Sequence, residues 1–320
     1  MSTMTVRVWS LLILLSILWG GSFFFVEIAL RGLEPLSIVF GRVSIAALAL
    51  LAYVYLSGQR MAWDMKSWRQ FFVMGGLNNL IPFSLIVWGQ SHIDSSLASI
   101  LNATTPLFTV ALAHVLTTDE KISLNKGLGI VFGIIGVAVL IGPGALDGLD
   151  GRAWGKIAIL GAAISYAFAG IYGRRLSRHS PSVAAAGMLI GSSAMLLPLA
   201  LIFESPLEAS PGAAVWASIM AIALLSTSLA YLLYFHILAK AGATNLLLVT
   251  FLIPVSALLL GIAVLGEQLS SHALIGMGLI FAGLAAVDGR LFRRLGQRFQ
   301  RQKHCRRNGG KECQEAEFHP

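Results

Sequence analysis

Long apolar stretches alternate with short polar segments along almost the whole chain. A helix rises about 1.5 Å per residue, so roughly 20 apolar residues cross a hydrocarbon core of about 30 Å. Two stretches, Ser95 to Leu116 and Thr244 to Leu265, contain no Lys, Arg, Asp or Glu. The pattern predicts an all-α integral membrane protein with ten transmembrane helices, over residues 8–29, 35–56, 69–89, 95–116, 127–142, 154–173, 182–203, 213–238, 243–265 and 272–289.

Two regions of the chain match each other at a nearly constant separation, which indicates an internal duplication. Pro106 and Pro254 lie 148 residues apart, and four further pairs lie 147 apart: Glu120 with Glu267, Ser123 with Ser270, Gly129 with Gly276, and Gly136 with Gly283. Upstream, Pro35 and Pro181 continue the match at 146. Because five spans per copy is an odd number, the second copy starts from the opposite side of the membrane. We predict two inverted five-helix repeats, 8–142 and 153–289, followed by a basic tail, 290–320.

The matched prolines, Pro106 and Pro254, fall near the middle of their spans. A proline leaves the carbonyl four residues earlier without its helical donor, here the carbonyls of Asn102 and Thr250. In lipid such a carbonyl needs another partner or lines a hydrated cavity. Broken helices at matching points of two halves therefore predict a substrate site between the halves.

Composition and charge place the chain in a membrane. Hydrophobic residues make up 56% of it, charged residues 12%, and the mean hydropathy is +0.78. With a cytoplasmic amino terminus, nineteen of the 23 Lys and Arg residues fall inside, Arg42 falls within a span, and only Arg31, Arg152 and Lys156 fall outside. This asymmetry predicts a multi-pass protein of the cell membrane with both termini in the cytoplasm.

The tail supplies most of the net charge of +8. Its basic residues, with apolar residues near helical spacing from Leu291 to Phe299, predict a short interfacial helix on anionic membrane lipid. Both cysteines, Cys305 and Cys313, lie in the tail, and their spacing with His304 and His319 matches no standard zinc motif. We expect no metal, no cofactor and no nucleic-acid partner.

Several of these segments resemble one known family. Trp19-Gly-Gly-Ser-Phe-Phe-Phe-Val, Pro106 with Asp119-Glu120-Lys-Ile-Ser123, and Pro254 with Gly266-Glu267-Gln-Leu-Ser270 look like the EamA repeats of the drug/metabolite transporter superfamily. The resemblance covers about residues 8 to 289. It implies a secondary transporter, often an exporter of amino acids or other small metabolites, with spans one to four and six to nine around a central cavity. The family often has a basic residue where this chain has Glu27.

Polar and aromatic residues within the spans are candidates for the substrate site. Adjacent asparagines, Asn78 and Asn79, cannot both face one direction on a helix, so we expect at most one to reach a substrate. The alternatives are polar contacts between helices and, for Trp and Tyr, packing or an interfacial belt. The full set of cavity candidates is Trp19, Asn78, Asn79, Asn102, Thr105, Tyr166, Thr227, Tyr231 and Thr250.

Glu27 and Arg42 are charges inside predicted spans, where an unpaired charge is costly. Both lie toward the outer ends of their spans. Three interpretations remain open: a structural ion pair, snorkelling to the outer surface, or a carboxylate that couples transport to protons.

The sequence favours a secondary transporter of small metabolites, with amino-acid-type export as the leading expectation and protons as a possible coupling ion. No G-x-x-x-x-G-K-[ST] loop for ATP is present. The alternatives are a broad drug/proton antiporter and a membrane acyltransferase, the latter from the five-residue spacing of His114 and Asp119; we predict no enzyme. Gly129 with Gly133 and Gly278 with Ala282 predict close helix contacts, either in a homodimer or within each half.

Overall fold

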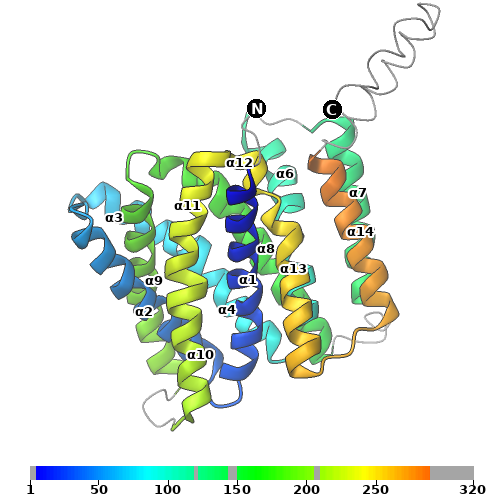
Figure 1. The fold of residues 1–320 in the computed structure, drawn as a ribbon, viewed down its shortest axis with the longest axis horizontal. Helices are drawn as coiled ribbons and strands as arrows, with labels where there is room; N and C mark the ends of the chain where they lie inside the picture. The colour runs from blue at the N-terminus through cyan, green and yellow to red at the C-terminus, as the bar shows by residue number, and fades with distance from the viewer. Residues whose placement is uncertain (1–4, 119–121, 143–149, 205–209, 289–320) are drawn as a thin grey trace, which may run out of the picture.

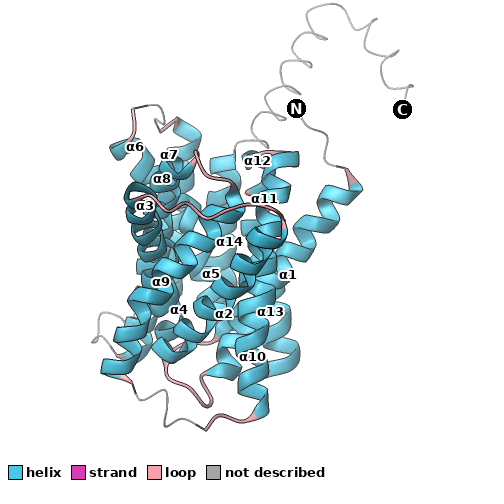
Figure 2. Cartoon of the chain, turned by 90° about the vertical axis from the view of Figure 1, so that its left-hand side faces the viewer, coloured by secondary structure: helices cyan, strands magenta, loops and turns pink. Residues whose placement is uncertain are grey.

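The computed structural model describes residues 5–118, 122–142, 150–204 and 210–288, and every regular element in these ranges is a helix. Figures 1 and 2 show the helices packed side by side with their axes roughly along one direction. Over the described residues, nine helical stretches are long and apolar enough to cross a membrane, together with one shorter apolar helix, Val249–Leu265. The all-helical membrane class is confirmed. The span expected over 243–265 corresponds to this shorter helix.

The elements follow the predicted stretches closely. The first part of the chain forms α1 (Val6–Ala29), α2 (Pro35–Leu56), α3 (Met65–Gly75), the π-helical segment η1 (Gly76–Leu80), α4 (Ile81–Gln90), α5 (Ser95–Asn102), α6 (Thr105–Leu116) and α7 (Leu124–Ile141). The second part forms α8 (Gly151–Tyr172), a 3-10 turn η3 (Gly173–Leu176), α9 (Pro181–Phe203), α10 (Ala213–Ala223), a π-helical η4 (Leu224–Leu229), α11 (Ala230–Ala241), α12 (Ala243–Leu246), α13 (Val249–Leu260), a π-helical η5 (Gly261–Leu265) and α14 (Ser271–Asp288).

Polar residues at the helix starts explain where several helices begin. Asp64 and Asp150 accept hydrogen bonds from the backbone N–H groups of Ser67 at 2.9 Å and Ala153 at 2.7 Å, and so cap α3 and α8. Proline begins both α2 and α9, at Pro35 and Pro181, where its missing N–H costs nothing.

Helices from the two parts of the chain pack in matching pairs. The element α1 lies against α13 and α10, and α8 lies against α6 and α4, while α2 packs along α9. The α7 and α14 helices lie together at one edge of the bundle (Figure 1). The core is therefore built across the two parts.

Glycines let α7 and α14 approach closely. A Cβ atom on Gly129 would lie 2.6 Å from the carbonyl oxygen of Gly283, and one on Gly136 would lie 2.9 Å from that of Gly276. The order of these contacts shows that the two helices run antiparallel. Gly129 and Gly133 are both buried within the chain. Gly129 meets α14 of the other half, whereas a Cβ atom on Gly133 would meet Leu107 of α6 in the same half. A homodimer stays a prediction. Gly278 is exposed with nothing near its Cβ position.

The two proline-containing spans break differently. Between α5 and α6 the helix is interrupted at residues 103–104, directly before Pro106, as predicted. In the other span the interruption is at residues 247–248, and Pro254 lies inside α13. The expectation of a break at Pro254 is therefore wrong. The Thr250 hydroxyl donates to the Leu247 carbonyl at 2.7 Å and so satisfies a carbonyl at the actual break.

Candidate substrate site

Two π-helical segments at matching points carry the polar residues of the candidate site. A π turn closes i to i+5 hydrogen bonds and widens the helix locally, a feature found frequently at functional sites. The segment η1 contains Asn78 and Asn79, and η4 contains Thr227 and Ser228, each inside a long span. The Thr227 and Ser228 hydroxyls donate to the carbonyls five residues earlier, those of Ile222 and Ala223, both at 2.9 Å. The hydroxyls thereby satisfy carbonyls within the widened turn.

Both asparagines join one hydrogen-bond network. The Asn78 side-chain amide donates to the Tyr231 hydroxyl at 2.9 Å, and that hydroxyl donates to Asn79 Oδ1 at 3.0 Å. Asn79 Nδ2 also donates to Ser192 Oγ on α9 at 3.3 Å. Both side chains therefore reach the same hydroxyl, that of Tyr231, although the residues are adjacent. The expectation that at most one of them reaches a substrate stays a prediction. Asn79 bonds a neighbouring helix, in line with the alternative of polar contacts between helices.

Arg42 lies in the interior next to this network. Its side chain is 6% exposed, and its Nε donates to Thr227 Oγ1 at 2.9 Å. The guanidinium carbon lies 3.7 Å from the centroid of the Phe83 ring, a cation–π contact. Tyr166 on α8 lies edge-on to Phe83, with ring centroids 6.5 Å apart.

These contacts bring together six of the predicted site residues from both parts of the chain. They are Arg42, Asn78, Asn79, Tyr166, Thr227 and Tyr231, which we call the central polar cluster together with Phe83 and Ser192. Ser192 and Phe83 were not predicted, because a serine and a phenylalanine within apolar helices carry no distinguishing pattern.

The other cavity candidates make their contacts elsewhere. Trp19 packs against Tyr234, with ring centroids 5.6 Å apart, in the apolar cluster of α1 and α11. The Asn102 carbonyl, which Pro106 frees, accepts a hydrogen bond from the Thr105 hydroxyl at 2.8 Å. The Asn102 Oδ1 atom is buried without a hydrogen-bond partner. The break between α5 and α6 thus presents one unpaired polar group.

Glu27 and Arg42 do not form an ion pair, so that interpretation is wrong. Within the described residues, Arg42 contacts Thr227 and Phe83, whereas the charged groups around Glu27 are Glu267, Asp94 and Arg31. The two residues were expected at a similar depth in the membrane, but their side chains do not point toward each other. The low exposure of Arg42 also excludes snorkelling for that residue.

Glu27 has its own polar neighbour. The Gln90 side chain lies beside the Glu27 carboxylate and donates through Nε2 to the Phe23 carbonyl at 2.9 Å. Glu27 Oε2 and Gln90 Oε1 are both buried, and neither has a hydrogen-bond partner. The Glu27 carboxylate thus has one buried oxygen without a hydrogen-bond partner, next to the Gln90 side chain.

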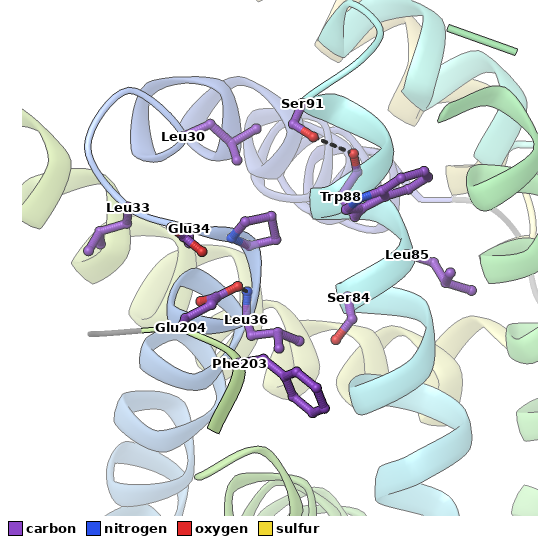
Figure 3. A pocket seen from close by; sticks show the side chains of 11 residues that line it. Leu30, Leu33, Glu34, Leu36, Ser84, Leu85, Trp88, Ser91, Phe203 and Glu204 are labelled. Atoms are coloured by element: carbon purple, nitrogen blue, oxygen red, sulfur yellow. Dashed lines mark hydrogen bonds between the residues drawn. The ribbon is translucent and has the colours of Figure 1, made fainter. Parts of the chain in front are cut away.

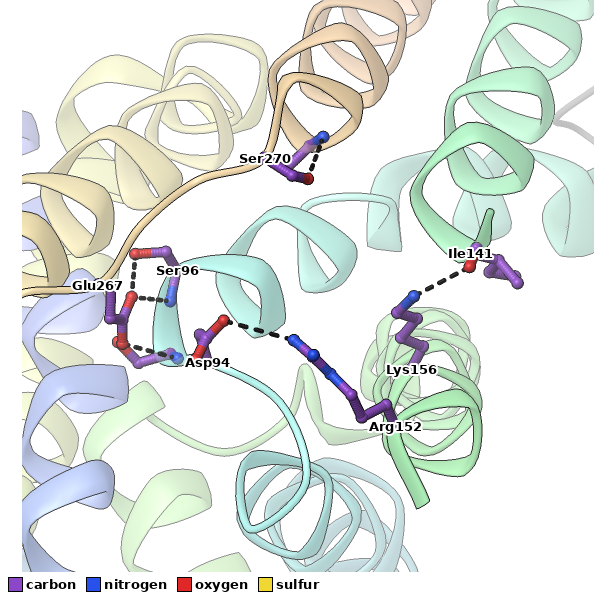
Figure 4. A network of polar contacts seen from close by, with 9 residues as sticks. Asp94, Ser96, Ile141, Arg152, Lys156, Glu267 and Ser270 are labelled. Atoms are coloured by element: carbon purple, nitrogen blue, oxygen red, sulfur yellow. Dashed lines mark hydrogen bonds and ion pairs between the residues drawn. The ribbon is translucent and has the colours of Figure 1, made fainter. Parts of the chain in front are cut away.

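Two glutamates bind the starts of helices from the other half of the chain. The Glu267 carboxylate accepts hydrogen bonds from the backbone N–H and the hydroxyl of both Ser95 and Ser96, at the start of α5 (Figure 4). Glu204 accepts from the N–H groups of Leu36 and Ser37, at 2.8 and 2.7 Å, at the start of α2. A carboxylate at a helix amino terminus satisfies free N–H groups and opposes the positive end of the helix dipole.

A pocket of about 740 Å³ lies at the same end of the bundle, between the start of α2 and the end of α4 (Figure 3). Its lining includes Leu36, Ser84, Trp88 and Glu204, and the Ser84 hydroxyl is buried without a partner. The sequence pattern gave no signal for this pocket, because its walls come from distant segments.

No contact among the described residues supports the acyltransferase alternative. The His114 ring Nδ1 accepts the backbone N–H of Ile122 at 3.2 Å, so the ring contacts the segment that leads into α7. Asp119 lies outside the described residues, as do Glu120 and the whole tail from residue 289 with its cysteines.

Comparison with known proteins identifies the family. The sequence profile described as the EamA-like transporter family matches residues 7–142 and 153–287, which is most of the chain. The chain belongs to the EamA-like transporter family. The chain is therefore a membrane transporter by family, a class not expected to be an enzyme.

Similar proteins come from distant organisms. The Uncharacterized transporter YoaV of Bacillus subtilis is 25% identical over 85% of this chain and 94% of its own length. The Uncharacterized inner membrane transporter YedA of Escherichia coli K12 is 26% identical over 85% and 88%. The WAT1-related protein At3g02690, chloroplastic, of Arabidopsis thaliana is 26% identical over 88% and 69%. A crystal structure at 19% identity covers 90% of this chain and 98% of its own, with a TM-score of 0.65, and so shares the fold.

Proposed function

We propose that this EamA-family protein is a secondary active transporter that moves small metabolites by alternating access, with export of amino acids or related compounds as its physiological role. The observation that carries the proposal is the central polar cluster. Its buried amide, hydroxyl and guanidinium groups come from α2 and η1 in one repeat and from α8, α9, η4 and α11 in the other. A site between two moving halves can open to either side of the membrane.

The architecture of this proposal is ten spans in two inverted repeats. The contact of α7 with α14 supports it, because Gly129 faces Gly283 and Gly136 faces Gly276, while the sequence repeat equates Gly129 with Gly276 and Gly136 with Gly283. Reciprocal contacts of this kind are typical of a two-fold relation. The mirrored packing of α1 on α13 and of α8 on α6 supports it as well.

The proposed orientation has both termini in the cytoplasm, in the plasma or inner membrane. Its support is the strong excess of Lys and Arg in the segments assigned to that side. The amino-acid role rests on the family resemblance.

Protons are the proposed coupling ion, and Glu27 is the proposed proton site. The support is that Oε2 of the Glu27 carboxylate is buried without a hydrogen-bond partner, so a proton on this group would remove a buried charge. We expect Glu27→Gln to abolish accumulation driven by a pH gradient and to leave counterflow exchange intact. Glutamine is always neutral, like protonated glutamate, and therefore cannot bind and release a proton in each cycle. Proteoliposomes with and without an imposed pH gradient provide the measurement. Unchanged uphill transport in this variant would remove Glu27 as the proton site.

An uptake screen tests the function as a whole. Proteoliposomes that contain the full chain are loaded with labelled amino acids, organic acids, amines and lipophilic cations, and empty liposomes serve as the control. Saturable flux of a few related metabolites supports the proposal. Flux inhibited by many unrelated cations would instead identify a broad drug/proton antiporter, and the absence of flux for every compound would contradict a transporter of small metabolites.

A further inference from the structure

Arg42 is a buried cation without an anionic partner. Of the five N–H groups on its guanidinium, the Nε–H donates to Thr227 Oγ1 at 2.9 Å. Within the described residues this is its only hydrogen bond, and the ion pairs found there, Arg152 with Asp94 and Arg178 with Asp64, do not include it. Four N–H groups remain without a protein acceptor in a side chain that is 6% exposed.

Such a charge needs compensation. An ionised group removed from water without a partner is costly, and arginine does not lose its proton in proteins. The ring of Phe83, 3.7 Å from the guanidinium carbon, provides a cation–π contact worth roughly 0.5 to 2 kcal/mol. This contact covers one face of the guanidinium plane. The edge that carries the Nη donors still has no acceptor.

The missing acceptor has a definite chemistry. A guanidinium presents parallel N–H groups that match the two oxygens of a carboxylate. The cluster contains one cation, which balances one negative charge. The nearby groups are neutral, namely the phenol rings of Tyr166 and Tyr231 and the Asn78 and Asn79 amides. Tyr166, which makes no hydrogen bond through its hydroxyl to any described residue, leaves a second donor next to Phe83.

We propose that Arg42 binds the substrate directly and that the transported compounds carry a carboxylate, which pairs with the free Nη edge of the guanidinium. This proposal rests on the proposed transport function and names the substrate class of its site. The Thr227 hydroxyl accepts a hydrogen bond from the guanidinium Nε–H, and η4 thereby sets the direction in which the Nη groups point. Phe83 and Tyr166 form an aromatic surface for the apolar part of the compound.

A binding experiment on purified full-length protein in nanodiscs tests the proposal. The probes are four compounds with the same isobutyl group: L-leucine, 4-methylpentanoate, L-leucinamide and isopentylamine. The first two carry a carboxylate and the last two do not. Thermal stabilisation by each probe is titrated for the wild type, Arg42→Lys, Arg42→Gln and the control Arg60→Gln, which removes an exposed charge from the segment after α2.

We expect the two carboxylates to stabilise the wild type and the Arg60→Gln variant. The apparent affinity should fall at least tenfold in Arg42→Gln, about 1.4 kcal/mol, with a smaller loss in Arg42→Lys, which keeps the charge but not the paired donors. Leucinamide and isopentylamine should not bind to the wild type. Because a loss of folding alone would also remove carboxylate binding, monodisperse elution of each variant is checked first.

Three results overturn the proposal: equal carboxylate affinity in Arg42→Gln, preference for the amine or amide probes, or no binding of either carboxylate. Transport of uncharged or cationic compounds in the uptake screen, unaffected by Arg42→Gln, would leave the transporter function standing and remove the carboxylate site alone. If Arg42→Gln does not fold, Arg42→Lys decides, because an unchanged carboxylate affinity in that variant contradicts paired binding by a guanidinium.

Discussion

At the scale of single residues, the buried polar groups of the central polar cluster act as a connected set. Tyr231 accepts from Asn78 and donates to Asn79, and Asn79 continues to Ser192. Removal of one member takes a hydrogen-bond partner from the others in the protein interior, which costs more than the hydrogen bond itself contributes.

Tyr231→Phe tests this network. We expect a loss of about 1 to 3 kcal/mol in the free energy of unfolding, because the Asn78 amide and Asn79 Oδ1 each lose a partner. Transport should fall as well. Tyr234→Phe is the control, since Tyr234 makes ring contacts with Trp19 and Phe235 and its hydroxyl has no hydrogen bond to a described residue. Equal thermal midpoints for the two variants would show that the network contributes nothing to stability.

Asp64 is a titratable group outside the spans with a clear pH dependence. Hydrogen bonds from Ser67, first from its hydroxyl and then from its backbone, together with the Arg178 guanidinium, lower the pKa of Asp64 below its ordinary value of 3.8. A lowered pKa in the folded state adds stability above pH 3.8, and this contribution is lost as the pH falls through the folded pKa. The difference in thermal midpoint between wild type and Asp64→Asn should therefore be constant near neutral pH and shrink below pH 3.8. A difference that grows on acidification would contradict this assignment.

At the scale of elements, packing decided the features that the apolar pattern did not reveal. The apolar runs located the helices, because length and hydrophobicity depend on the residues alone. The π turn at η4 is accompanied by hydroxyl contacts such as Thr227 to Ile222, which need the folded helix. The break at residues 247–248 follows no proline. Whether Glu27 and Arg42 form an ion pair depends on the rotation of their helices, which the apolar pattern does not reveal.

The contact of α7 with α14 leads to a matched pair of substitutions on one helix. Gly283→Ala would place a methyl group 2.6 Å from the Gly129 carbonyl oxygen, and it should push the helices apart at a cost of about 1 to 3 kcal/mol. Gly278→Ala fills open space on the same helix and should leave stability unchanged or slightly higher. Thermal unfolding in detergent measures both. Equal losses would mean that α14 is sensitive to any added methyl group, whatever its contacts.

At the scale of the whole molecule, the sequence predicted the family and the helical membrane class, and six residues of the central polar cluster were among its site candidates. In the structure, Asn79 and Thr227 lie 148 residues apart in the two π-helical segments, and both belong to the cluster. Which candidates meet could not be predicted, because Trp19 and Tyr231 look equally suitable until the helix faces are known. The Glu204 and Glu267 contacts with helix starts depend on distant chain segments and gave no local signal.

The two cysteines test the orientation of the protein. Cys305 and Cys313 are the only cysteines of the chain, and both belong to the tail that we expect in the cytoplasm. A membrane-impermeant maleimide should therefore label inverted membrane vesicles and leave intact spheroplasts unlabelled. Labelling of intact spheroplasts, at the level reached after detergent treatment, would reverse the predicted orientation.

If Arg42 binds a carboxylate and Glu27 a proton, as proposed, the transport cycle depends on the membrane voltage. When Glu27 holds a proton and the site is vacant, these two groups sum to one positive charge; with a monocarboxylate bound and Glu27 ionised, they and the ligand sum to one negative charge. A unit charge that crosses 100 mV exchanges about 2.3 kcal/mol with the electric field. A negative cell interior pulls the vacant form toward the cytoplasm and pushes the occupied form outward. An electrogenic cycle of this kind would discharge organic acids from the cell against a concentration gradient.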